Sequence, residues 1–259
     1  MMKNGEIIEN QRLKGDYFKV RFYAPQICET ARAGQFVHVR ITPRGDRILR
    51  RPFSIYNCEN DALEVVYKVV GGGTKELSEL SPGNVCNLLG PLGVSFSDPL
   101  PGVIPVLVAG GYGAAATYLL TKQVSQRGIF LIGARSKSDV LLTDEYQKEK
   151  YEVRVATDDG SEGHCGFVTD LVAQLLKEKP DEKFFFYGCG PHPMLMALAK
   201  LLRANRQKGE LSIDHLMCCG IGACFACVVK VKADTLPGWT FARACVDGPV
   251  FNLDSVYVE

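Results

Sequence analysis

VIPVLVAGGYG, at residues 103–113, combines a strand signal with a ligand-binding turn. Its first seven residues are almost continuously apolar, as expected for a strand that is buried on both faces of a sheet. The glycines that follow, Gly110, Gly111 and Gly113, permit a tight turn, and residues 114–123 have a helical composition. A buried strand, a glycine-rich turn and a helix in this order predict one unit of a parallel α/β sheet.

The same alternation continues downstream of this stretch. Residues 130–132, 151–156 and 184–187 have the composition of further strands. Residues 169–177 and 193–202 have the apolar spacing of amphipathic helices. Strands that alternate with helices predict a parallel sheet in this half of the chain.

A second strand-to-helix junction, YGCGP at residues 187–191, resembles the first. Glycines at such junctions let a phosphate reach the N-terminus of a helix, where the backbone N–H groups point outward. Two such crevices at the carboxyl ends of strands suit a dinucleotide. Plain tight turns are the alternative. Cys189, in the second junction, is either a thiol near a nicotinamide or a small buried residue.

Residues 1–97 have a different pattern. Short stretches with alternating apolar side chains occur at 17–23, 36–41, 53–56 and 63–69, and turn residues separate them. Short strands at this spacing predict an antiparallel barrel or sandwich. Residues 98–102 contain two prolines and are expected to form a linker between the two halves.

The sequence RPFSIY at residues 51–56 is a candidate flavin motif. An arginine can clamp a pyrophosphate with its planar guanidinium group, and the Ser54 hydroxyl can hydrogen-bond the flavin ring. The glycine run at residues 71–73 offers backbone amides for phosphate, next to the Thr74 hydroxyl. By itself RPFS could be an exposed strand with an ordinary serine, but the glycine run favours a flavin.

Cysteines cluster near the C-terminus, in MCCGIGACFACVV at residues 217–229. Cys219, Cys224 and Cys227 have C-x4-C-x2-C spacing, and Cys245 follows after seventeen intervening residues. Apart from that shorter last gap, this is the spacing of a plant-type [2Fe–2S] loop. A four-cysteine zinc site, usually built from two C-x2-C pairs, and a set of buried thiols without a metal are the alternatives. Cys218 would give C-x5-C and is expected to be a spectator.

Composition and charge exclude several other classes. The 259-residue chain has a formal net charge of +1, so we expect no nucleic-acid partner. Residues 1–10 are polar and do not resemble a signal peptide, and no apolar run is long enough for a bilayer. We therefore expect a cytoplasmic protein without a membrane partner. The four histidines, His38, His164, His192 and His215, form no cluster along the sequence and are interpreted as surface or structural residues.

The three motifs, in this order, resemble the ferredoxin reductase-like flavoprotein family. The strings TDDGS at 157–161, GFVTD at 166–170 and CVDGPVF at 245–251 look most like the electron-transfer subunits of type B dihydroorotate dehydrogenases. The resemblance implies a multidomain β plus α/β protein. Residues 1–97 would form an antiparallel FAD-binding β-barrel, 98–208 a parallel-sheet NAD-binding domain, and 209–259 a small [2Fe–2S] domain.

The resemblance also implies a set of site residues. Those that would bind FAD are Arg51, Pro52, Phe53, Ser54, Ile55, Tyr56, Lys68, Gly72, Gly73 and Thr74. Those that would border NAD(H) are Gly110, Gly111, Gly113, Asp159, Cys189 and Gly190. Those that would bind the cluster are Cys219, Cys224, Cys227 and Cys245. Ser54 and Cys189 would take part in catalysis. Alanines at 114–116 stand where relatives often carry a proline, which affects the expected helix start.

The expected function is an electron relay. NADH delivers two electrons as a hydride and a cluster accepts one at a time, so a flavin between them is required. The sequence has no obvious second substrate site, which implies a partner protein. By resemblance the partner is the FMN-containing catalytic subunit that oxidises dihydroorotate to orotate in pyrimidine biosynthesis, in a heterotetramer with two copies of each subunit.

Several related functions remain open from the residues themselves. The chain could be a reductase subunit of another complex, such as sulfite reductase, or a stand-alone ferredoxin reductase. A zinc-stabilised binding module that has lost its flavin is a third alternative. The choice between NAD and NADP is also open: Arg135 and Ser136 could contact a 2′-phosphate, whereas Asp158 and Asp159 would repel one. The resemblance favours NAD.

Overall fold

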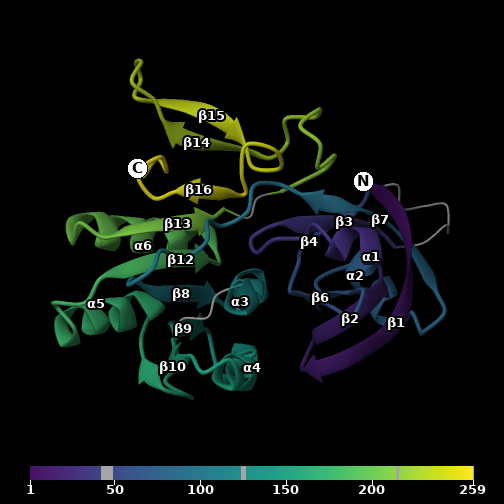
Figure 1. The fold of residues 1–259 in the computed structure, drawn as a ribbon, viewed down its shortest axis with the longest axis horizontal. Coiled ribbons are helices and arrows are strands. Elements are labelled where there is room, and N and C mark those ends of the chain that lie inside the picture. The colour runs from purple at the N-terminus through teal and green to yellow at the C-terminus, as the bar shows by residue number, and fades with distance from the viewer. Residues whose placement is uncertain (42–48, 124–126, 214–215, 259) are drawn as a thin grey trace.

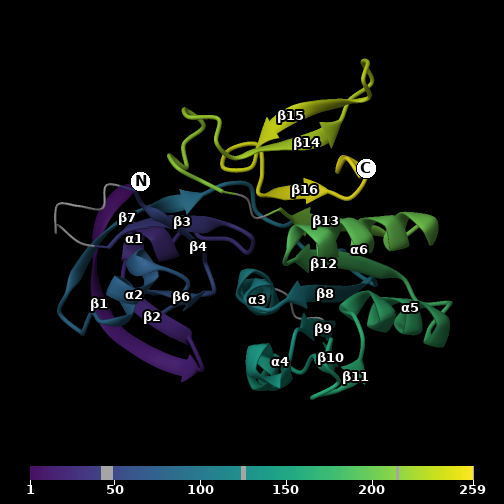
Figure 2. The same cartoon turned by 180° about the vertical axis from the view of Figure 1, so that it is seen from behind.

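The computed structural model describes residues 1–41, 49–123, 127–213 and 216–258. The strands in these ranges form two seven-stranded sheets and one two-stranded hairpin (Figure 1). The first sheet belongs to the N-terminal half of the chain, the second mainly to the C-terminal half, and the hairpin lies beside both in the two opposite views (Figures 1 and 2). The predicted combination of an antiparallel β domain and an α/β domain is confirmed.

The first sheet is antiparallel, with the strand order β4-β3-β7-β1-β2-β6-β5. Its elements are β1 (Met2–Lys14), β2 (Tyr17–Tyr23), α1 (Pro25–Cys28), β3 (Phe36–Arg40), β4 (Arg51–Ser54), β5 (Asn57–Glu59), β6 (Ala62–Lys68), α2 (Gly72–Ser78) and β7 (Val85–Leu92). Past the end of β4, the Tyr56 N–H donates to the Glu64 carbonyl of β6 at 2.9 Å, so the edge strand β4 leads directly to β6, the neighbour of the other edge strand, and the sheet curls into a barrel. The sequence did not predict β1, because polar side chains alternate with its few buried residues.

The second sheet has the strand order β11-β10-β9-β8-β12-β13-β16. Its strands are β8 (Ile104–Gly110), β9 (Ile129–Ala134), β10 (Glu152–Thr157), β11 (His164–Cys165), β12 (Phe184–Cys189), β13 (Lys208–Ser212) and β16 (Val250–Asn252). All neighbours are parallel except β13 and β16. β13 crosses the boundary predicted at residues 208 and 209, and β16 joins this sheet from within the predicted cluster domain.

Helices cover both faces of the second sheet. They are α3 (Gly113–Gln123), α4 (Thr143–Lys148), α5 (Val168–Glu178) and α6 (His192–Ala204), with a short 3-10 helix η1 (Lys137–Asp139). In Figures 1 and 2, α3 and α4 lie on the side of the barrel, and α5 and α6 lie on the other side. Residues 106–109 of β8 are therefore completely buried, as the apolar run predicted.

The barrel and the α/β domain share one hydrophobic core. Leu107 and Ala109 of β8 belong to the same cluster of buried side chains as the barrel residues, whereas Val106 and Val108 point to the opposite face. Tyr56, just after β4, stacks on Tyr118 of α3 with the ring centroids 4.6 Å apart. The two domains are thus packed directly against each other.

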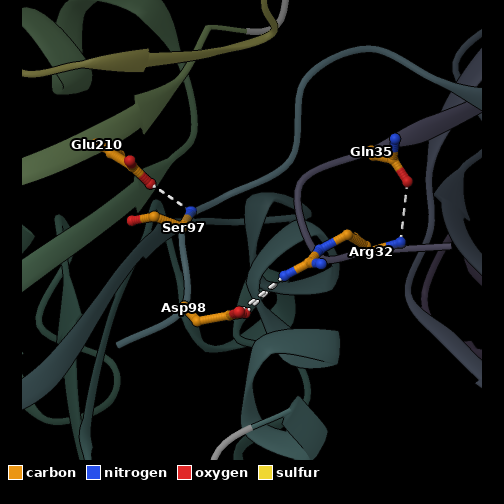
Figure 3. A network of polar contacts seen from close by, with 5 residues as sticks. All are labelled: Arg32, Gln35, Ser97, Asp98 and Glu210. Atoms are coloured by element: carbon orange, nitrogen blue, oxygen red, sulfur yellow. Dashed lines mark hydrogen bonds and ion pairs between the residues drawn. The ribbon is translucent and has the colours of Figure 1, made fainter. Parts of the chain in front are cut away.

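The segment between the two large sheets is bonded to both of them (Figure 3). The Ser97 N–H donates to the Glu210 carboxylate of β13 at 2.8 Å. The next residue, Asp98, accepts hydrogen bonds from the Arg32 guanidinium at 2.8 and 2.9 Å, on the loop before β3. Gln35 in turn accepts from the Arg32 N–H at 2.9 Å. These contacts hold the linker at the junction of the two domains.

The hairpin consists of β14 (Val228–Lys232) and β15 (Trp239–Arg243). Val94, past the end of β7, forms a parallel bridge with Pro249 and donates its N–H to the Gly248 carbonyl at 2.6 Å. The C-terminal segment is therefore fastened to the barrel as well as to β13. None of the helices in the described ranges is both long and apolar enough to cross a membrane.

Candidate functional site

The β14–β15 hairpin brings distant cysteines together. Val228 pairs with Arg243 across the hairpin, and the Ala244 N–H donates to the Cys227 carbonyl at 2.9 Å. The pairing places Cys245 beside Cys227, and their thiols are hydrogen-bonded to each other. Both thiols are buried in a small cluster with Phe36, Met217 and Ala244. The seventeen residues between the third and fourth cysteines are thus folded back into an antiparallel ribbon.

The loop before the hairpin forms a second cysteine pair. The Cys224 N–H donates to the Cys219 sulfur at 3.4 Å, and the two side chains also contact each other. Burial raises the pKa of Cys219, but hydrogen bonds from the N–H groups of Ile221, Cys224 and Ala223 outweigh it and bring the pKa down to about 6. Gly220 and Gly222, with φ of 72° and 80°, allow the backbone to curl around this sulfur.

The paired arrangement fits two irons better than one metal ion. Within the described part of the chain, no three His, Cys, Asp or Glu side chains converge as the ligands of a single ion would. Cys219 adjoins Cys224 and Cys227 adjoins Cys245. Backbone amides directed at a cysteine sulfur also match what an iron–sulfur cluster requires. The predicted ligand set is therefore compatible with a [2Fe–2S] cluster, and Cys218 as a spectator stays a prediction.

The first four residues of the flavin motif, Arg51 to Ser54, form β4, and all four are half-buried. The Arg51 guanidinium lies against the first turn of α2: a Cβ built on Gly73 would be 2.7 Å from Nε and 2.8 Å from Nη2. Nη1 donates to the Leu49 carbonyl at 2.7 Å. Arg51 and the glycine run are therefore brought together, with Thr74 bonded through its hydroxyl to the Gly71 N–H and carbonyl. A cationic fork beside bare backbone amides fits a pyrophosphate.

The remaining residues predicted for FAD are placed differently. Ile55 is completely buried and Tyr56 is 4% exposed, stacked on Tyr118. Lys68 forms a 2.8 Å ion pair with Asp139, which also accepts a 2.7 Å hydrogen bond from the Tyr17 hydroxyl. The Lys68 bridge links the barrel to η1 of the α/β domain. The roles of Ile55, Tyr56 and Lys68 toward FAD stay predictions.

A cavity of about 600 Å³ lies at the carboxyl ends of the parallel strands. It is lined by residues of both domains: Tyr17, Lys68, Gly110, Gly111, Tyr112, Gly133, Ala134, Arg135, Asp139, Asp158, Phe167, Val168, Thr169, Pro191, Pro193, Met194 and Ala197. This is where open α/β sheets bind nucleotides. Its volume is in the usual range for small-molecule sites, which supports the nucleotide crevice inferred from the two glycine junctions.

The two glycine junctions are in direct contact. A Cβ on Gly190 would lie 2.9 Å from the Gly110 backbone nitrogen, and one on Gly113 would lie 2.3 Å from the Cys189 carbonyl oxygen. Cys189 itself is 4% exposed at the end of β12, so its predicted catalytic role rests on position alone.

The two neighbouring acidic residues near the cavity are placed differently from each other. Asp158 lines the cavity, whereas Asp159 is turned into its own loop and accepts hydrogen bonds from the Ser161 N–H at 3.0 Å and hydroxyl at 2.6 Å. Sequence reasoning did not find Tyr17 and Asp139, because neither belongs to a motif and only packing of the barrel against the sheet brings them to the cavity. His215 lies outside the described residues.

Comparisons with known proteins match the two regions of the chain that contain the glycine junctions and the cysteine pairs. Residues 107–200 match the model of the oxidoreductase NAD-binding domain, and residues 214–257 match that of the iron-sulfur cluster binding domain of dihydroorotate dehydrogenase B. A solved NADH-dependent reduced ferredoxin-NADP oxidoreductase is 30% identical, with a TM-score of 0.84 over 98% of this chain and 89% of that chain. A ferredoxin reductase of carbazole 1,9a-dioxygenase, 23% identical with a TM-score of 0.68 over 80% of this chain and 66% of that chain, shares the fold.

Curated relatives extend over nearly the full length. The dihydroorotate dehydrogenase B (NAD(+)) electron transfer subunit of Fusobacterium nucleatum subsp. nucleatum is 36% identical, with 97% of this chain and 96% of that protein covered. The subunit of the same name from Desulforamulus reducens is 38% identical over 90% of each chain. At this identity and coverage, the chain belongs to the family of dihydroorotate dehydrogenase B (NAD(+)) electron transfer subunits.

Proposed function

We propose that this chain carries electrons between NAD(H) and a dihydroorotate-oxidising catalytic subunit, through FAD at β4 and a [2Fe–2S] cluster in the loop before β14. The observation that carries the proposal is the position of β3. It pairs with the flavin strand β4, with Phe36 opposite Ser54. Phe36 also packs in the small cluster that contains Cys227 and Cys245. One strand thus joins the two sites, as a relay requires.

FAD would be held mainly by the Arg51 guanidinium and the backbone of the glycine run. Arg51 supplies Nε and Nη2, the two atoms nearest to Gly73, as charge-assisted donors to a pyrophosphate. Ser54, half-buried at the end of β4, would donate its hydroxyl to the ring edge. When bound, the flavin converts hydride transfer into single-electron transfer.

NAD(H) would occupy the cavity between the barrel and the α/β domain. Gly110 and Gly111 line this cavity just before α3, and nothing lies within 4 Å of a Cβ built on Gly111, so a pyrophosphate would approach the start of α3 at this turn. Arg135 and Asp158 both line the cavity, so a guanidinium that would suit a 2′-phosphate and a carboxylate that would suit a ribose hydroxyl are both close to the ligand. The relatives are named for NAD(+), which supports the Asp158 contact with a ribose hydroxyl.

The partner would dock over the exposed edge of the cluster loop. Cys224 is exposed, unlike Cys227 and Cys245. Apolar side chains of the loop and its flanks are exposed beside it: Leu216 by 72%, Ile221 by 58% and Phe225 by 62%. We propose that the FMN-containing catalytic subunit covers this edge, in a cytoplasmic complex with two copies of each subunit, because exposed aromatic and aliphatic side chains commonly anchor interfaces.

Anaerobic purification and visible spectroscopy test this proposal. We expect flavin bands with broad iron–sulfur absorption beneath them, and both should bleach when NADH is added. The Cys245→Ser variant is the matched control and should keep the flavin bands but lose the broad absorption. A colourless wild-type protein, or one whose absorption does not respond to NADH, would contradict the proposed relay.

A further inference from the structure

Four charged side chains, two of each sign, line the cavity between the domains: Lys68, Arg135, Asp139 and Asp158. Arg135 and Asp158 directly follow β9 and β10, two adjacent strands of the parallel sheet. In open α/β sheets the end of the second strand reaches the adenosine ribose, where an acidic residue binds the 2′-hydroxyl or an arginine accommodates a 2′-phosphate. Charges at this end of the cavity therefore bear on the choice between NAD(H) and NADP(H).

The two cations of the cavity come from different domains. Lys68 is the last residue of β6 in the barrel, whereas Arg135 belongs to the α/β domain. A phosphate monoester carries about two negative charges at pH 7, so two cations in one cavity would suit a 2′-phosphate. The Lys68 ammonium is already paired, however, because Nζ lies 2.8 Å from Oδ1 of Asp139. The side chains of Lys68 and Asp139 are 35% and 21% exposed, so solvent screens this pair only in part.

Tyr17 contacts both members of the ion pair. Its hydroxyl donates a 2.7 Å hydrogen bond to the same Oδ1 of Asp139. The Nζ atom of Lys68 lies 4.7 Å from the centroid of the Tyr17 ring, within the range of a cation–π contact. Hydrogen bonds from Lys68 and Tyr17, with a smaller contribution from the charge of Arg135, hold the pKa of Asp139 below its usual value. The carboxylate is therefore ionised near pH 7 and neutralises Lys68.

We propose that Asp139 is a specificity-determining residue for NAD(H): it neutralises Lys68 and so removes one of the two cations that would otherwise bind a 2′-phosphate. This inference rests on the proposed function, because it concerns the nucleotide that the cavity takes. Asp158 faces the nucleotide directly, whereas Asp139 acts through Lys68. Asp139 is thus a positioning residue, and Tyr17 holds it against Lys68.

Steady-state kinetics of the full chain, loaded with FAD and cluster and supplied with ferricyanide as electron acceptor, test the proposal. In Asp139→Asn the ratio of kcat/KM for NADPH to that for NADH should rise about tenfold, as expected for one more charge-assisted hydrogen bond to the 2′-phosphate. The gain should come mainly from a lower KM for NADPH. Asp144→Asn is the matched control, because this exposed aspartate on α4 lies outside the cavity lining and should leave the ratio unchanged.

A double variant tests whether the effect passes through Lys68. When Lys68→Met is combined with Asp139→Asn, the ratio should return to within about twofold of the wild-type value, because the cation that Asp139 releases is absent. A gain that persists in the double variant would show that Asp139 repels the 2′-phosphate by itself, and this would overturn the proposal. An unchanged ratio in Asp139→Asn would overturn it as well.

Nucleotide binding gives a second measurement that does not depend on flavin or cluster. Calorimetric titration should show that Asp139→Asn binds adenosine 2′,5′-bisphosphate about tenfold more tightly than the wild-type chain does, whereas the double variant should not. The affinity for 5′-AMP, which lacks the 2′-phosphate, should change in neither protein. An equal gain for both nucleotides would contradict a role in specificity.

The two proposals fail in different ways. If the wild-type chain binds neither NADH nor 5′-AMP, the nucleotide site of the proposed function is wrong. If NADH reduces the wild-type chain but Asp139→Asn gains nothing for the 2′-phosphate, only this inference is wrong. A wild-type chain that prefers the bisphosphate to 5′-AMP would also overturn the inference, because Lys68 would then act as a free cation.

Discussion

Replacing Gly73 by alanine should weaken FAD binding without unfolding the protein. The new Cβ would lie 2.7 Å from Nε and 2.8 Å from Nη2 of Arg51. Since ordinary contacts between nonbonded heavy atoms are about 3.5 Å, the guanidinium would have to retreat by about 0.8 Å. A hydrogen bond to a phosphate that is lengthened by that much no longer counts as one.

The size of the effect follows from the bond that is lost. A hydrogen bond to a charged group contributes about 1.5–3 kcal/mol, so FAD should bind about 10- to 150-fold more weakly. The free energy of unfolding of the protein without FAD should rise slightly or stay the same. Gly73 lies in the first turn of α2, where alanine is the better helix former by up to about 1 kcal/mol, and the side chain that it displaces is long and flexible.

Gly71→Ala is the matched control, two residues earlier. Its backbone is extended, with φ of −177°, and nothing lies within 4 Å of the added Cβ. The assay is FAD titration of the apoprotein followed by flavin fluorescence, with urea unfolding of each apoprotein alongside. If Gly73→Ala binds FAD as tightly as Gly71→Ala, Arg51 is not the pyrophosphate clamp. A parallel loss of apoprotein stability would show instead that the substitution disturbs the fold.

The other predictions concern the cluster, the nucleotide, the domain contact and the partner. Serine at Cys219, Cys224, Cys227 or Cys245 should remove the cluster, whereas Cys218→Ser should keep it; iron and sulfide analysis decides, and loss in Cys218→Ser would contradict the ligand set. Asp158→Asn should raise the ratio of kcat/KM for NADPH to that for NADH by about tenfold, because the carboxylate that repels the 2′-phosphate is removed from the cavity wall; an unchanged ratio would refute the role of Asp158. Asp139→Asn should lower the free energy of unfolding by about 0.5 kcal/mol near pH 7. Lys68 and Tyr17 hold the pKa of Asp139 below its usual 3.8, so the difference in stability should persist as the pH falls. It should disappear only below about pH 4, where the wild-type carboxyl group becomes protonated and loses its charge. Urea unfolding across this pH range measures the difference. Phe225→Ser should weaken binding of the catalytic subunit about 30-fold, as expected for an exposed aromatic anchor worth about 2 kcal/mol, while Tyr23→Ser, an exposed aromatic on β2, should not; calorimetric titration measures both.

Local chemistry was enough to predict the elements with strong patterns. The strand β8 could be predicted from its sequence alone, because a strand that is buried on both faces is apolar at every position. Glycine at a strand-to-helix junction and C-x4-C-x2-C spacing are likewise recognisable within a few residues. The first allows one short turn to bind a phosphate, and the second allows one short loop to bind a metal cluster. The family resemblance drew on these same local motifs.

Contacts between distant segments could not be predicted in this way. β1 pairs with both β2 and β7, and only that pairing makes its polar sequence a strand. Tyr17, Lys68 and Asp139 meet because the barrel packs against η1, and His38 faces Gly220 because a loop some 180 positions further along folds over β3. A histidine in sequence shows neither its burial nor its neighbours. Sequence therefore identified which cofactors this chain is built to hold, and the tertiary structure alone brought the side chains of the barrel to the cluster and to the nucleotide, because those contacts depend on how whole domains pack.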